Sequence, residues 1–141
     1  MPASPSLPSA GGCQCGTVRF TVTEPPQIIY VCHCRKCRKQ SASAFGISVI
    51  VPRDALRITS GTPAHWSCAG DSGRIFDSAF CADCGTRLWH AGEGSATISI
   101  KGGSLDEPPG LEDAVHIWVS RKLPGVIIPD GAQQFPEEPD D

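Results

Sequence analysis

CADCG at residues 81–85, together with the related CQCG at 13–16, decides how this chain folds. Each stretch is a pair of cysteines followed at once by glycine, which permits the tight backbone turn of a metal-binding knuckle. Because residues two apart in an extended strand face the same side, Cys13 and Cys15 can bind one ion together. Two such pairs predict a closed, structural zinc site, although spacing alone leaves other pairings of the thiols open. The predicted ligands are Cys13, Cys15, Cys81 and Cys84.

VCHCRKC at 31–37 carries a second group of thiols: Cys32, Cys34 and Cys37. Catalytic zinc typically keeps three protein ligands and one exchangeable position, so the number of thiols predicts an open site for water or a substrate thiolate. Cys68 would close this shell if it capped the triplet; the alternative is a free thiol that packs as a small apolar residue. An extended backbone would point His33 away from its two cysteine neighbours.

The bulk composition is that of one soluble globular domain, with 141 residues, 40% hydrophobic, 19% charged and a net charge of -3. This acidic balance argues against binding to nucleic acid or to an anionic membrane, and no apolar run is long enough to span a bilayer. The N-terminus lacks the features of a secretory signal, so we expect a cytoplasmic protein. In a reducing compartment, eight clustered cysteines favour metal binding over disulfides.

Period-two alternation of apolar and polar residues, which is the pattern of half-buried strands, dominates the chain. The segments with this pattern are 18–23, 28–31, 46–51, 85–90, 97–100 and 115–120. Only 34–45 suits a helix. The sequence therefore predicts a mostly β domain of two sheets or a half-open barrel, with at most one short helix.

The ends of the chain are too polar to bury. We expect a disordered segment at 1–10, a zinc-binding domain at 11–128, and an acidic, loosely ordered tail at 129–141. The three tryptophans are expected in the core. They are Trp66, Trp89 and Trp118.

Five motifs, in order, resemble those of the glutathione-dependent formaldehyde-activating family, and the centromere protein V domain is similar. They are GGCQCGTVRF (11–20), CHCRKCRKQSASAFG (32–46), FCADCGTRL (80–88), ISIKGGSLDEP (98–108) and HIWVSRKLPGVIIPDGAQQFP (116–136). The resemblance implies a tent-like fold of small antiparallel sheets, with a zinc-ribbon-like structural zinc on the first four cysteines and a second zinc on Cys32, Cys34 and Cys37. It implies a carbon–sulfur lyase that forms or cleaves S-(hydroxymethyl)glutathione from formaldehyde and glutathione or a related thiol.

Two positions depart from the family pattern and leave the substrate open. Gly125 stands where a tryptophan is common, and Gln40 stands where a larger or aromatic residue is frequent. The physiological thiol and aldehyde and the oligomeric state do not follow from the sequence.

Charged and histidine side chains near the triplet are candidates for substrate contacts. Three thiolates with one Zn²⁺ carry a net negative charge, which favours a zinc that holds the substrate thiolate over one that activates the aldehyde. A basic run offsets this charge and is predicted to hold substrate carboxylates; a solvated basic turn is the alternative. This run comprises Arg35, Lys36, Arg38 and Lys39. His116 becomes a candidate proton carrier if its strand face lines a cleft.

Two classes of function compete for this pattern. A zinc-dependent lyase requires an open position on the three-cysteine zinc, facing a cleft. A non-catalytic zinc module that mediates protein or ligand interactions would instead show a closed shell or a convex surface there. A third possibility is a thiol cluster that only buffers or senses thiol-reactive compounds.

Overall fold

The computed structural model describes residues 7–70 and 73–139, which form a mostly β domain with one short α-helix. This confirms the predicted fold class. The strands are β1 (Ser9–Gly12), β2 (Arg19–Val22), β3 (Ile28–Cys32), β4 (Gly46–Pro52), β5 (Leu56–Ser60), β6 (Ala64–Ala69), β7 (Ile75–Phe80), β8 (Arg87–Gly92), β9 (Thr97–Lys101) and β10 (Val115–Ile117). The helix is α1 (Arg35–Ser41), and the 3-10 turns are η1 (Arg53–Ala55), η2 (Gly102–Ser104) and η3 (Val119–Arg121).

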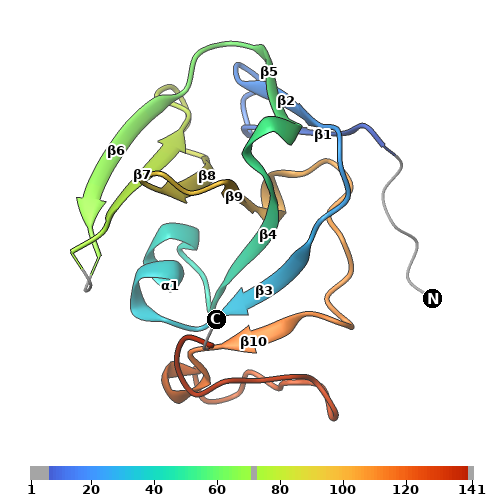
Figure 1. Cartoon of the computed structure of the whole chain (residues 1–141), viewed down its shortest axis with the longest axis vertical. Coiled ribbons are helices and arrows are strands. Elements are labelled where there is room, and N and C mark those ends of the chain that lie inside the picture. Colours follow the sequence, from blue (N-terminus) through green and yellow to red (C-terminus); the bar gives the residue numbers. More distant parts are fainter. Residues whose placement is uncertain (1–6, 71–72, 140–141) are drawn as a thin grey trace.

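The strands form two sheets, as expected. A three-stranded sheet has the order β1-β2-β5, and a seven-stranded sheet has the order β10-β3-β4-β9-β8-β7-β6. Neighbouring strands are antiparallel except for β10, which lies parallel to β3. The seven-stranded sheet curves, and α1 lies in its hollow (Figure 1).

One apolar core joins the two sheets. Phe20 from β2 is fully buried and meets Trp89 from β8 edge to face, with ring centroids 5.7 Å apart. The alternation in β4 and β9 supplies the rest of this face, because every second side chain of a strand points to the same side. These residues are Val49, Val51, Ile98 and Ile100.

The opposite face of the seven-stranded sheet is polar and still buried. Ser48 lies directly across from Lys101 in the β4–β9 pair, and Ser99 lies across from His90 in the β9–β8 pair. Residues directly opposite one another share a face. Ser48, Ser99 and Lys101 are each less than a tenth exposed. Burial of polar groups without partners is unfavourable for stability. This face is therefore the first place to look for a functional site.

The C-terminal segment differs from the loosely ordered tail that the sequence predicts. Residues 133–137 run beside β10 and the turn after it, with the Phe135 amide donating to the His116 carbonyl at 2.9 Å. Phe135 also packs against a small cluster that contains Cys32 and Val115. A single aromatic anchor and a ladder of backbone hydrogen bonds order this segment despite its acidic composition.

Three smaller differences concern exposed or terminal strands. Ser9 and Ala10 belong to β1, although we expected order to begin at residue 11. Strands β6 and β7 lack a clear alternation in the sequence, and β6 is an edge strand that is mostly exposed. Trp66 on β6 is 52% exposed, so its placement in the core was wrong. Within the described ranges, the helices are too short and polar to cross a membrane.

Candidate active site

Two matching turns bring the first four cysteines together. After β1, the Cys13 amide donates to the Val18 carbonyl, and the turn passes through Gly16 with a φ of +84°. After β7, the Cys81 amide donates to the Thr86 carbonyl, and that turn passes through Gly85 with a φ of +82°. The positive φ explains why a glycine follows each cysteine pair.

The spacing of these four sulfurs fits a tetrahedral metal. All four Sγ atoms lie within 4.8 Å of one another. Cys13 and Cys15 Sγ are 3.6 Å apart, and Cys15 and Cys81 Sγ are 3.8 Å apart. Zinc–sulfur bonds of about 2.3 Å in a tetrahedron place the sulfurs about 3.8 Å apart. Hydrogen bonds from Thr86 lower the pKa of Cys84 to about 5, which favours the thiolate that a metal needs.

The second group of cysteines lies where β3 passes into α1. Cys32 ends β3, Cys34 is the N-cap of α1, and Cys37 lies in the first turn of the helix. The Cys34 sulfur accepts a hydrogen bond from the Cys37 amide at 3.3 Å. The three Sγ atoms also lie within 4.8 Å of one another. Helix capping by Cys34 therefore fixes the geometry of the triplet.

The protonation of the triplet also suits a metal. Hydrogen bonds from Cys32 and Cys37 lower the pKa of Cys34, while the pKa of Cys32 is raised, first of all by its hydrogen bond to Cys34. Three thiolates in so small a space repel one another and do not all form readily without a cation. A divalent cation would allow all three to ionise, so the donor set fits a zinc ion as well as the first site does.

In the described part of the chain, the triplet gains no fourth ligand from a histidine, cysteine or carboxylate. Cys68 lies in the edge strand β6 opposite Phe76 and belongs to neither cysteine group. It therefore does not cap the triplet, and the alternative of a partly buried free thiol holds. The described residues therefore leave the three-cysteine set one short of the four ligands of a closed tetrahedral site.

His33 and His116 form a buried pair. The Nε2 atom of His33 lies 3.0 Å from the Nδ1 atom of His116, and both side chains are at most 5% exposed. Burial lowers the pKa of His33 to about 4, so the pair is neutral at pH 7. His33 thus points away from the cysteines, as expected. His116 does not line either of the two cavities described below, and its role as a proton carrier stays a prediction.

A cleft of about 770 Å³ lies beside the four-cysteine group, and its lining does not include Cys32, Cys34 or Cys37. Cys13 and Cys84 form part of one wall. Gly46 is on the other side, where an added Cβ would come within 3.1 Å of the Cys37 Cβ. Residues at the end of α1 and after it complete that wall: Gln40, Ser41, Ala42 and Ser43. The cleft has the size for a tripeptide-like ligand.

Arg87 and Lys101 are the cleft residues that sequence reasoning missed. Both line the cleft, and Lys101 donates a 2.6 Å hydrogen bond to the Gln40 side-chain oxygen. The sequence does carry a signal for Lys101, because this lysine continues the period-two alternation of segment 97–100 and precedes two glycines. Gln40, one of the two departures from the family pattern, therefore contacts the cleft, whereas Gly125 is not on its wall.

The basic run on α1 is placed differently from what we expected. None of its four members lines the cleft. Arg35, Lys36 and Lys39 are exposed, whereas Arg38 is partly buried. Their role in binding substrate carboxylates stays a prediction.

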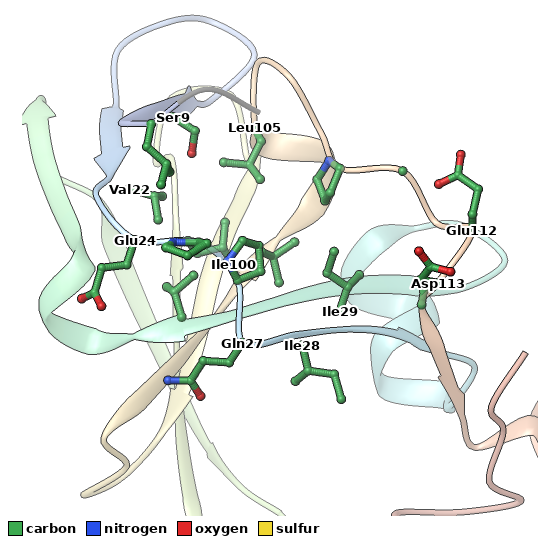
Figure 2. Close-up of a pocket in the computed structure, with 18 residues that line it drawn as sticks. Ser9, Val22, Glu24, Gln27, Ile28, Ile29, Ile100, Leu105, Glu112 and Asp113 are labelled. Carbon is green, nitrogen blue, oxygen red and sulfur yellow. The ribbon is translucent and has the colours of Figure 1, made fainter. Parts of the chain in front are cut away.

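A second cavity, of about 450 Å³, lies away from the cysteines (Figure 2). Ile29, Ile100 and Leu105 give it apolar walls, and Glu24 and Glu112 carry carboxylates at its periphery. No cysteine lines it. It therefore offers no thiol that could hold a metal ion.

Comparison with known proteins shows the family to which the chain belongs. The model of the glutathione-dependent formaldehyde-activating enzyme family matches residues 8–121. The chain belongs to this family. A Penicillium rubens relative named "Putative glutathione-dependent formaldehyde-activating enzyme" is 35% identical over 85 residues, which cover 57% of this chain and 44% of the relative. A Phaeosphaeria nodorum relative of the same name is 31% identical over 80 residues, which cover 55% of this chain and 40% of the relative.

The match therefore spans less than half the length of these curated relatives. A crystal structure of a Rhodobacter sphaeroides protein superposes with a TM-score of 0.56 at 20% identity, covering 69% of this chain and 87% of that one. At this identity the likeness concerns the fold alone. Fold and family membership are thus established independently of each other, as the sequence motifs predicted.

Proposed function

We propose that this protein is a zinc-dependent carbon–sulfur lyase that forms or cleaves S-(hydroxymethyl)glutathione from formaldehyde and glutathione or a related thiol. Family membership supports glutathione and formaldehyde as the reactants. The observation that carries the proposal is the three-cysteine set without a fourth protein ligand in the described residues, next to the wall of a cleft. A closed shell on a convex surface would have favoured a binding module.

The chain's own groups divide the work between the two cysteine sets. Cys13, Cys15, Cys81 and Cys84 would hold a structural zinc, and Cys32, Cys34 and Cys37 a second one. That second ion, with one position free, would supply a site where a thiol binds as thiolate. The cleft then positions the rest of the thiol substrate beside that site. We also place the protein in the cytoplasm, because thiolate sites of this kind need reducing conditions.

Metal counting combined with thiol titration tests this proposal. Wild-type protein should hold two zinc ions and bind glutathione, whereas Cys34→Ser should hold about one zinc, keep its circular dichroism spectrum and lose glutathione binding. Cys68→Ser is the matched control, since it removes a thiol outside both sets, and it should behave as wild type. Retention of two zincs and of glutathione binding in Cys34→Ser would overturn the proposed division.

Catalysis needs its own measurement, because formaldehyde and thiols combine without help. The rate of exchange between glutathione and its hydroxymethyl adduct, followed by nuclear magnetic resonance, should rise with added wild-type protein and not with Cys34→Ser. A two-zinc protein that binds glutathione without accelerating this exchange would be a zinc-containing binding module instead.

A further inference from the structure

Two cationic side chains lie together on the buried polar face of the seven-stranded sheet, both at the wall of the cleft. Lys101, on β9, is 9% exposed. Arg87, on β8, is partly buried and lies over the Trp66 and Phe80 rings, with its guanidinium carbon 5.8 and 5.9 Å from their centroids. Burial of a cation is unfavourable unless an anion or several hydrogen-bond acceptors compensate it.

The described residues do not supply that compensation. Lys101 donates to the neutral Gln40 amide, and no carboxylate pairs with it there. A lysine ammonium has three donors, so two remain for a ligand. The Nη1 atom of Arg87 is buried without a hydrogen-bond partner in the same part of the chain. Burial lowers the pKa of Lys101, and the neighbouring Arg87 lowers it further, which shows that the two cations repel each other.

The position of this pair relates it to the three-cysteine site. Lys101 donates to Gln40, which lies three residues after Cys37 on α1, and the cleft residue Gly46 packs against the Cys37 Cβ. The nearby His90 adds no charge at pH 7, because burial lowers its pKa to about 3. The cleft wall therefore carries a cationic site that the described residues leave unneutralised, one helical turn from the three-cysteine set.

We propose that Lys101 and Arg87 form the binding site for a carboxylate of the thiol substrate, held in reach of the three-cysteine site. The inference rests on the proposed function, from which it takes the class of substrate: an anionic, amino-acid-derived thiol. Lys101 supplies a charged donor held in place by Gln40, and Arg87 supplies the unpaired Nη1 donor. The exposed basic residues of α1 are then not needed for recognition of the carboxylate.

The probe for this site is S-methylglutathione, which keeps both carboxylates of glutathione but has no free thiol. Calorimetric titration of the two-zinc protein should show binding. Lys101→Met and Arg87→Met should each weaken it about tenfold, because each removes a charge-assisted hydrogen bond while keeping an apolar stem of similar length. Arg57→Met is the charge-matched control; Arg57 is exposed on β5, outside the cleft, and the variant should bind as wild type.

Wild-type affinity in both cleft variants, or no binding of the probe to wild-type protein at millimolar concentration, would overturn the inference. If a cleft variant fails to fold, as judged by circular dichroism and zinc content, amide chemical-shift mapping on wild-type protein tests whether the probe binds at Lys101 and Arg87. The probe should shift the amide resonances of residues 87 and 101 and leave that of residue 57 unchanged. The reverse pattern would contradict the site.

N-acetylcysteinamide, a neutral thiol, separates this inference from the proposed function. It requires the open three-cysteine site but not the carboxylate site, so Lys101→Met should bind it as wild type does. If no thiol binds while S-methylglutathione still does, the proposed function fails and the carboxylate site stands. Equal weakening of the neutral thiol and of S-methylglutathione in Lys101→Met would show that the lysine acts on the fold or on the metal instead.

Discussion

A single bulge decides what Arg87 and Trp89 touch. In a regular strand these two side chains would share a face, because they are two residues apart. The β7–β8 register shifts between Ala79 and Phe80, so that Phe80 pairs with Arg87 and Ala79 with Trp89. Trp89 therefore enters the core against Phe20, whereas Arg87 lies over Phe80 at the cleft. Bulges beside functional sites commonly redirect one side chain in this way.

His90 should make the stability of the protein depend on pH. Burial holds its pKa at about 3 in the folded chain, below the value of 6.5 that is usual for histidine. As the pH falls below 6.5, the unfolded chain takes up the proton first, so the free energy of unfolding falls by about 1.4 kcal/mol per pH unit down to the folded pKa. Above pH 6.5 this contribution is complete.

His90→Gln removes this contribution. Urea unfolding at pH 7 and pH 5 should show that the stability of wild type, relative to the variant, falls by about 2 kcal/mol at the lower pH. Metal release in acid affects both proteins and cancels in the comparison. The same pH dependence in both proteins would mean that His90 is not buried as a neutral group.

Among the secondary-structure elements, β10 shows how a short strand gains support from the chain that follows it. Only its three residues pair with β3, over the segment that ends at Cys32. The C-terminal segment adds a second line of hydrogen bonds on the outer side, including one from the Val119 amide to the Phe135 carbonyl at 3.1 Å. The aromatic ring of Phe135 covers the cluster to which Cys32 belongs. The tail thus supports the strand pair that positions the three-cysteine site.

Phe135→Ala should lower the free energy of unfolding by about 1–3 kcal/mol, less than the cost for a fully buried phenylalanine because the ring is only partly covered. Ile127→Ala is the control, since Ile127 is 87% exposed, and it should leave the stability unchanged. Urea unfolding at fixed zinc concentration measures both variants. Equal stability of the two variants would show that the tail only rests on the surface.

For the molecule as a whole, the four-cysteine site joins the two sheets. Its first pair follows β1 of the three-stranded sheet, and its second pair follows β7 of the seven-stranded sheet. The three-cysteine site lies instead within a single connection, from β3 to α1. The two sites should therefore have different effects on the fold when they lose metal.

Cys81→Ser should prevent folding, because a structural zinc site contributes about 10–16 kcal/mol, which is as much as the whole stability of a typical domain. Its circular dichroism spectrum should show the loss of the sheets. Graded removal of zinc by a chelator should release one ion from wild type without unfolding and the second with unfolding. A folded Cys81→Ser protein, or unfolding upon loss of the first ion, would contradict this assignment.

Local patterns made the larger part of the fold predictable. Alternation indicated β2, β4 and β9 because one face of each strand packs in the apolar core and the other is polar, and paired cysteines with glycine indicated the two knuckles. The same patterns missed β6, an exposed edge strand, its neighbour β7, and the order of the C-terminal segment, which depends on one aromatic residue. Alternation arises where one face of a strand packs in an apolar core, so an exposed edge strand and a tail carry little of it.

By itself, the sequence determined the mostly β class and the family, and it predicted the sets of four and three cysteines that the structure brings together, because these depend on patterns within short segments. Only the tertiary structure decided that Cys68 lies apart, that His116 is buried, and that Gln40, Arg87 and Lys101 line one cleft. Gln40 and Lys101 are 61 residues apart in the chain. Contacts at such distances depend on sheet register and on a bulge, and neither is encoded in any one segment.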